Sequence, residues 1–161
     1  MRVSTAFNRM LALGGATVTG VRFEPEGMVV ELRLRARRLR CPCGCSTRAG
    51  YDQSRRRWRH LDAGGCRLWL EAAIRRLYCR CCQKVVTEVV PWARPGAWHS
   101  RDFEDVVAWL AQRSDKTTIA TLLRCGWKAV DNIIRRVVAA QLDAARQEGL
   151  YRIGVDEISY R

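Results

Sequence analysis

The sequence predicts an α+β fold, in which a small β-rich, zinc-ribbon-like part precedes a three-helix part. Three observations support this prediction. Apolar and polar residues alternate over residues 28–36 and 66–74, as they do in half-buried strands. Cysteines gather in two tight groups, at residues 41–45 and 79–82. Beyond residue 99, apolar residues recur three and four positions apart, which is the spacing of an amphipathic helix.

Segment boundaries follow from changes in these patterns. Residues 1–37 are predicted to form an N-terminal β-hairpin segment, because two alternating runs flank a turn-forming sequence at residues 24–27. Residues 38–90 are then predicted to form a zinc-binding β-domain, because they contain both cysteine groups. Residues 91–99 contain two prolines and a glycine and are predicted to be a linker. A helix-turn-helix domain is expected over residues 100–148.

The two cysteine groups predict a structural zinc site. They hold six of the eight cysteines: Cys41, Cys43 and Cys45 in the first group, and Cys79, Cys81 and Cys82 in the second. Cys79 and Cys82 have the C-x-x-C spacing of a zinc knuckle, while the first group is irregular and leaves Cys43 or Cys45 to complete the site. A thioredoxin-like redox pair is the weaker alternative, because this C-x-x-C does not open a helix.

The remaining cysteines need no special chemistry. An intracellular chain keeps its thiols reduced, so a disulfide framework is not expected. Cys66 and Cys125 stand alone and are predicted to be small buried hydrophobic residues. His60 and His99 are possible substitutes for one thiolate, but nothing in their spacing requires this role.

Charge points to a polyanionic partner. The 161 residues include 29 Lys and Arg against 16 Asp and Glu, a formal net charge of +13. Residues 33–80 alone hold 14 Arg against three acids, so their net charge is +11. Nucleic acid is the favoured partner, and a solvated charged face is the alternative. The candidate phosphate-binding residues are Arg55, Arg56, Arg57 and Arg59.

Tryptophans are interleaved with these arginines. Trp58 and Trp69 are expected either to stack on bases or to fill a small core with arginine stems over them.

The helical part has the pattern of a helix-turn-helix. Ser100 is predicted to cap the first helix, a short second helix covers residues 116–124, and a third begins near Trp127. Arg124 stands where this motif commonly has glycine, and Gly126 is expected to take over that role. The residues predicted to face outward and contact DNA are Trp127, Lys128, Asn132 and Arg135. A plain three-helix bundle would show the same apolar pattern.

The final residues, 150–161, form a β-rich run that contains Asp156. A carboxylate on such a strand can hold a divalent cation, but a two-metal site needs further acids. Asp156 alone is more often a solvated acid at the end of a strand.

Several motifs together resemble the bacterial insertion-sequence transposases of the ISL-three family. They are Cys41-Pro42-x-Gly44, Arg57-Trp58-Arg59-His60-Leu61-Asp62, Cys79-x-x-Cys82, Val90-Pro91-Trp92-Ala93-Arg94-Pro95-Gly96, Arg101-Asp102-Phe103-Glu104 and Ile153-Gly154-Val155-Asp156-Glu157-Ile158-Ser159. The resemblance implies a zinc-binding domain, a helix-turn-helix and an RNase H-like DDE catalytic domain. It implies that Cys41, Cys43, Cys79 and Cys82 bind zinc and that Asp156 is the first catalytic acid.

The expected function is that of the N-terminal part of such a transposase. It would recognise the terminal inverted repeats of an insertion sequence in double-stranded DNA, in the cytoplasm and associated with the nucleoid. The resemblance places the other two acids far downstream, so the chain is expected to stop within the first strand of the catalytic domain. It should therefore be inactive alone, since Mg or Mn serves only the complete catalytic domain.

Other partners and functions are also considered. A second copy or the full-length transposase is a candidate partner, and a membrane is not, because no run of about 18 apolar residues occurs. The alternative functions are a free-standing zinc-containing transcriptional regulator and an inhibitory fragment that pairs with the full-length enzyme.

Overall fold

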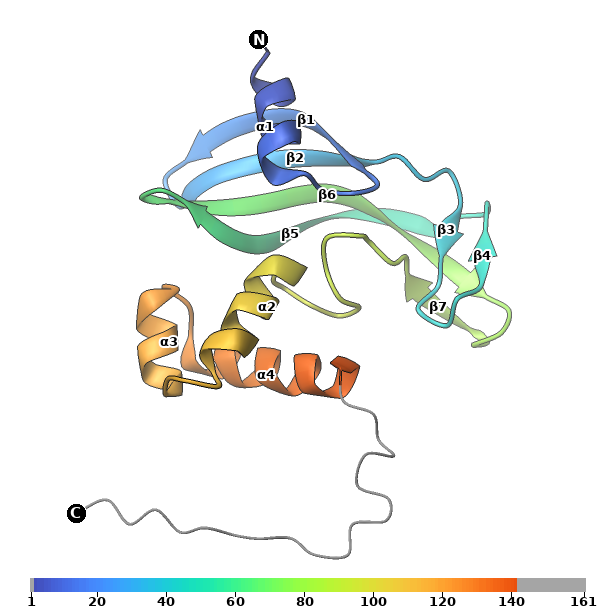
Figure 1. Ribbon diagram of the computed structural model, residues 1–161. Coiled ribbons are helices and arrows are strands. Elements are labelled where there is room, and N and C mark those ends of the chain that lie inside the picture. The colour runs from blue at the N-terminus through green and yellow to red at the C-terminus, as the bar shows by residue number, and fades with distance from the viewer. Residues whose placement is uncertain (1, 142–161) are drawn as a thin grey trace, which may run out of the picture.

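The computed structural model describes residues 2–141 and confirms the α+β class (Figure 1). The predicted strand over residues 150–161 and the end of the predicted helical domain, residues 142–148, lie outside the described residues. In chain order the elements are α1 (Val3–Leu11), β1 (Ala16–Glu24), β2 (Gly27–Leu34), β3 (Leu39–Arg40), β4 (Ser46–Thr47), β5 (Asp52–Ala63), β6 (Cys66–Cys79), β7 (Lys84–Thr87), α2 (Arg101–Leu110), α3 (Lys116–Leu122) and α4 (Trp127–Gln141).

Five strands form the main sheet, in the order β1-β2-β6-β5, with β7 paired to the end of β6. All neighbours are antiparallel except β2 and β6, which run parallel with Val30 opposite Leu70. The strands β3 and β4 form a separate ribbon. The structure therefore differs from the predicted boundary at residue 37, since β1 and β2 share one sheet with β5 and β6.

The turn between β1 and β2 requires glycine. Gly27 has a φ of +138°, and a Cβ there would collide with the backbone carbonyl of Arg67 on β6. This close approach holds the turn against the neighbouring strand.

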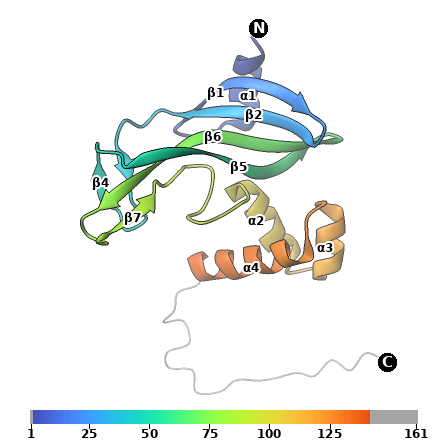
Figure 2. The same ribbon diagram turned by 180° about the vertical axis from the view of Figure 1, so that it is seen from behind.

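One face of the sheet forms the main hydrophobic core, and the predicted linker is part of it. Trp92, Ala93 and Ala97 are buried in this core, and Trp92 packs edge-on against Trp58 with 5.4 Å between ring centroids. Residues 91–99 thus run along the sheet before α2 (Figure 2). The linker prediction is corrected here, because burial of a large indole outweighs the breaker signal of the prolines and glycine.

Helix α1 is an addition to the predicted elements. Its Phe7 and Leu11, one turn apart, pack against the main core. The side chain of Asn8 accepts a hydrogen bond from the Val18 N–H at 2.9 Å and so fixes α1 beside β1. The apolar pattern of these nine residues is too short to distinguish a helix from a loop in the sequence.

The three predicted helices are confirmed as α2, α3 and α4. The Ser100 hydroxyl accepts a hydrogen bond from the Phe103 N–H at 3.2 Å, which confirms it as the cap of α2. Asp115 caps α3 in the same way. Their shared core consists of Phe103, Val107, Ile119, Val130, Ile133 and Val137. No helix within residues 2–141 is long and apolar enough to cross a membrane.

The turn between α3 and α4 differs from the prediction. Arg124 itself takes the left-handed conformation, with a φ of 51°, and Gly126 does not. The guanidinium of Arg124 pairs with Asp62 and also donates to the Gly65 carbonyl at 3.2 Å. These contacts join the turn to the β5–β6 hairpin. They are made by a residue whose left-handed backbone conformation is rare for arginine.

Buried polar contacts join the sheet to the helices. Glu104 on α2 is fully buried and pairs with Arg94 from residues 91–99 and with Arg136 on α4. His60 on β5 shares a 2.7 Å hydrogen bond with the hydroxyl of Ser100. Helix α2 therefore sits in a fixed position against β5.

Candidate metal centre and nucleic-acid interface

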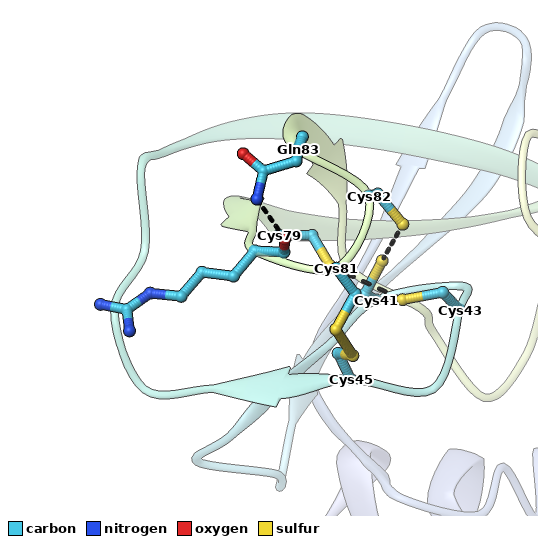
Figure 3. Close-up of a disulfide and its surroundings, with 8 residues drawn as sticks. Cys41, Cys43, Cys45, Cys79, Cys81, Cys82 and Gln83 are labelled. Carbon is cyan, nitrogen blue, oxygen red and sulfur yellow. Dashed lines mark hydrogen bonds between the residues drawn. A yellow bond between two sulfur atoms is a disulfide. The ribbon is translucent and has the colours of Figure 1, made fainter.

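Two hairpin ends bring the cysteine groups together at one end of the sheet (Figure 3). The first group fills the turn between β3 and β4, where the Cys41 N–H donates to the Cys45 carbonyl at 2.8 Å. The Gly44 N–H donates to the Cys41 carbonyl at 2.9 Å, and Gly44 has a φ of +93°. The second group fills the turn between β6 and β7. Sulfur atoms of each short turn therefore lie close to sulfur atoms of the other turn.

Four thiols form a group with the geometry of a zinc site. The Sγ atoms of Cys41 and Cys82 are 3.7 Å apart, and those of Cys43 and Cys79 are 3.6 Å apart. All four sulfurs lie within 4.8 Å of one another. Tetrahedral zinc with Zn–S bonds of about 2.3 Å places its sulfurs about 3.8 Å apart. The residues present therefore fit a zinc ion.

The surroundings also suit a structural metal. Cys41 and Cys79 are buried and pack with Leu39 and Leu77 in a small cluster of their own. Backbone N–H groups of Cys82 and Cys81 lower the pKa of Cys79 to about 7. Hydrogen bonding by the neighbouring thiols, that of Cys43 first, raises the pKa of Cys82 to about 12. Zinc binds thiolates, so metal binding to this group would release the protons that its thiols carry.

Cys45 and Cys81 are joined in a disulfide, which corrects the expectation that all thiols are reduced. The structure also separates the two candidates in the first group, since Cys43 lies in the four-thiol group and Cys45 pairs with Cys81. Cys66 is exposed, contrary to prediction, whereas Cys125 is half-buried. His60 and His99 are held near α2, and neither belongs to a metal-ligating group within residues 2–141.

The arginines of β5 have different surroundings from those predicted. Arg59 is only 4% exposed, donates to two backbone carbonyls and pairs with Asp62, so it is unavailable to phosphate. Arg56 donates to the Ala97 carbonyl at 2.7 Å, and burial lowers its pKa. Trp58 is buried in the main core rather than free to stack on bases.

Ion pairs neutralise much of the remaining charge on β5. Arg57 contacts Glu71 at 2.6 Å and Glu24 at 2.8 Å, and these carboxylates raise its pKa. Arg55 also reaches Glu71, at 3.0 Å, but its side chain remains 75% exposed. Of the four predicted phosphate-binding arginines, Arg55 is thus the most accessible.

The predicted DNA-reading residues of α4 share one exposed surface. Trp127, Lys128, Asn132 and Arg135 are all exposed. Lys116, from the start of α3, lies 4.8 Å from the ring centroid of Trp127. Lys116 was missed from the sequence because only the fold brings it beside α4.

Asp131 lies beside this surface and pairs with two of its basic residues. Its carboxylate pairs with Lys116 and lies 2.9 Å from Arg135. Lys128 and Asn132 form no side-chain ion pair or hydrogen bond with any residue between 2 and 141. The surface combines one amide, basic groups and an indole, which are the groups that contact base edges and phosphates.

Comparison with family models gives two matches. Residues 88–138 match the helix-turn-helix domain of transposase family ISL3. Residues 43–82 match the zinc-finger of transposases IS204, IS1001, IS1096 and IS1165. The second match contains Cys43, Cys79 and Cys82 and begins two residues after Cys41.

Curated relatives agree with these matches. The chain is 37% identical over 173 aligned residues to the transposase for insertion sequence element IS1557 of Mycobacterium tuberculosis, in strains CDC 1551 and H37Rv. The alignment covers the whole chain but 38% of each relative. No solved structure matches the chain.

Proposed function

Because the chain belongs to the ISL3 family of transposases through its zinc-finger and helix-turn-helix domains, we propose that it recognises the terminal inverted repeats of an insertion sequence. The observation that carries this proposal is the exposed surface of α4, which is built on the helix that a helix-turn-helix places in the major groove. DNA recognition, and no catalytic step, is the role proposed for residues 2–141.

Helix α4 supplies sequence selectivity in this proposal. Lys128 near its start and Asn132 one turn later lie on the side turned away from the helical core. An asparagine amide pairs with adenine through two hydrogen bonds, and a lysine ammonium suits guanine or phosphate. Trp127, with Lys116 over its ring, would contact the sugar-phosphate backbone beside the groove.

The zinc ligands in this proposal are Cys41, Cys43, Cys79 and Cys82. When bound, zinc would cross-link the two hairpin turns that these residues occupy and leave no open coordination position. The chain itself supplies the rest: short turns aim the sulfurs, and Leu39 and Leu77 exclude water from one side. The metal would therefore hold the end of the sheet together rather than take part in chemistry.

Phosphate contacts come from a different set of arginines than the sequence predicts. Arg55 stays in the proposed phosphate-binding set, whereas Arg59 leaves it because its side chain is buried. The replacements are exposed, lie in or beside β2 and the two cysteine hairpins, and have no ion-pair partner within residues 2–141: Arg33, Arg37, Arg38, Arg40, Arg48 and Arg80. They would bind phosphates without reading sequence.

Duplex binding by the purified chain tests the proposal. A duplex carrying the ends of the element that encodes the chain is compared with a scrambled duplex of equal composition at fixed salt. The native ends should bind at least tenfold more tightly. Equal affinity for the two duplexes would refute sequence recognition.

A pair of variants tests the assignment of α4. Asn132→Ala should weaken binding to the native ends by about 1–3 kcal/mol, the value of one good base contact. Its binding to the scrambled duplex should not change. Gln141→Ala, which alters an exposed residue at the far end of α4, is the matched control and should leave both affinities unchanged.

A further inference from the structure

The cysteine cluster contains more sulfur than one zinc ion needs. Cys41, Cys43, Cys79 and Cys82 form one group of ligands, and Cys45, Cys79 and Cys81 form a second. In each group the sulfurs lie within 4.8 Å of one another, and Cys79 belongs to both. Figure 3 shows the Cys45–Cys81 bond in the same cluster as the other four cysteines.

The second group faces open space. A cavity of about 580 Å³ is lined by Cys45, Cys79 and Cys81, together with Tyr51 and Arg80. A metal held by the three sulfurs would have its fourth coordination position toward this cavity. Water would fill that position, as happens at zinc sites with three protein ligands.

We propose that the reduced chain binds a second thiophilic divalent ion through Cys45, Cys79 and Cys81, with the Cys79 thiolate bridging the two ions. In the oxidised chain the Cys45–Cys81 bond removes two of the three ligands, so only the first ion is held. The number of bound ions therefore reports the redox state of this pair. The proposal concerns the metal centre alone and does not depend on DNA binding.

Charge is compatible with two ions. Six thiolates with two divalent cations leave two negative charges, the same as four thiolates with one cation. Arg40 and Arg80 adjoin Cys41 and the second cysteine group in sequence, are exposed, and have no ion-pair partner within residues 2–141. They can offset the charge of either state.

The redox step balances with a phosphine as reductant. The phosphine and one water reduce the Cys45–Cys81 bond to two thiols, the phosphine becoming a phosphine oxide that takes the water oxygen. The two water protons end on the sulfurs. Both protons then pass to the buffer when zinc binds.

Metal analysis of the full 161-residue chain tests the proposal. The chain is loaded with Zn²⁺, with and without a phosphine, and zinc per chain is measured after removal of free metal. We expect two zinc ions in the reduced chain and one after oxidation of the pair. One ion in the reduced chain, or two in the oxidised chain, would overturn the proposal.

Variants locate the second ion. Cys45→Ser and Cys81→Ser should each hold one zinc with or without the phosphine, because each removes a ligand from the second group only and leaves no Cys45–Cys81 bond to reduce. Cys66→Ser alters an exposed cysteine outside the cluster and should still hold two when reduced. Two ions in Cys81→Ser would contradict the assignment.

Cobalt substitution tests the bridge. Two Co²⁺ ions that share the Cys79 thiolate should couple magnetically, so the electron paramagnetic resonance signal should fall below that of two isolated ions. The Cys81→Ser chain should give the full signal of one isolated ion. Two uncoupled Co²⁺ ions in the reduced chain would exclude Cys79 as a bridge.

Discussion

The sheet and the helical part use their charged residues in opposite ways. In the sheet, Glu71 alone receives ion pairs from Arg22, Arg55 and Arg57, and Arg59 is buried. In the helical part, where the net charge is far smaller, the outer surface of α4 keeps several polar side chains exposed. Much of the charge in β5 thus stabilises the sheet.

Net charge indicates which class of partner the protein binds, but it does not show which arginines are free to contact that partner. A large excess of arginine identifies nucleic acid as the class of partner. The positions of the carboxylates decide which arginines remain available, because a paired or buried guanidinium has little left to offer a phosphate. Within residues 2–141, the exposed arginines beside the cysteine cluster, among them Arg40, Arg48 and Arg80, have no ion-pair partner and so remain available.

Loss of the proposed zinc ion should have the largest effect on the stability of the sheet. Cys79→Ser takes away a sulfur that both ligand groups share, and structural zinc in small domains contributes about 10–16 kcal/mol of apparent binding energy. We expect loss of bound zinc and of cooperative unfolding at the cysteine end of the sheet. Zinc analysis with hydrogen exchange checks this, and full protection at residues 39–47 would contradict it.

Trp92→Ala tests whether residues 91–99 belong to the sheet core. It should lower the free energy of unfolding by about 3–5 kcal/mol, because it opens a cavity beneath Trp58. Denaturant unfolding measures this. Trp98→Ala, at a site that is 65% exposed, is the control and should cost less than about 1 kcal/mol. Equal effects of the two variants would restore the linker prediction.

Glu104→Ala tests the junction between the two parts. It leaves Arg94 and Arg136 without their buried carboxylate and should cost about 3–5 kcal/mol. Asp105→Asn, at an exposed partner of Arg94, should cost no more than about 1 kcal/mol. The comparison uses urea unfolding, and a small loss for Glu104→Ala would mean that the apolar contacts alone fix α2.

Two histidines near α2, buried His60 and partly buried His99, predict a loss of stability in mild acid. Burial lowers the pKa of His99 to about 4, below its unfolded value of 6.5, and lowers that of His60 in the same direction. The unfolded state therefore binds more protons, so stability is complete above pH 6.5 and falls as the pH drops toward 4.

For His99, which is only partly buried, the loss should be about 1–2 kcal/mol. His99→Gln should flatten this part of the stability profile, measured by unfolding at a series of pH values. An unchanged slope would assign the effect to other groups.

The smallest expected effect is at the turn of the helix-turn-helix. Arg124→Gly relieves a left-handed backbone conformation but removes the pair with Asp62, so the two effects should cancel to within about 1 kcal/mol. The urea midpoint measures this. A loss of more than about 2 kcal/mol would show that the ion pair fixes the turn against the sheet.

Local patterns were enough to predict much of the molecule. The starts of α2 and α4 follow from a capping serine and from apolar spacing, which act within one or two turns. The meeting of the two cysteine groups follows from short spacings that form knuckles, whereas the spacing left open whether Cys43 or Cys45 joins the four-thiol group. Both features depend on residues that are close in the chain.

Features that depend on distant residues could not be predicted in this way. The pairing of β2 with β6, the burial of Arg59 against α2 and the insertion of Trp92 beside Trp58 each join separate segments. Arg59 has the same sequence context as Arg55 and Arg57, yet its position beside Asp62 and Phe103 buries it. Alternation predicts its strand but not the helix that covers it.

The parallel pairing of β2 with β6 has a consequence for synthesis of the protein. Residues 28–32 have no partner strand on that side until residues 68–72 have left the ribosome. Until then Val30 and Leu32, which are buried in the finished sheet, remain open to water and to other chains. Long-range pairing of this kind folds slowly and is exposed to aggregation, so the nascent chain should depend on chaperones until β6 is complete.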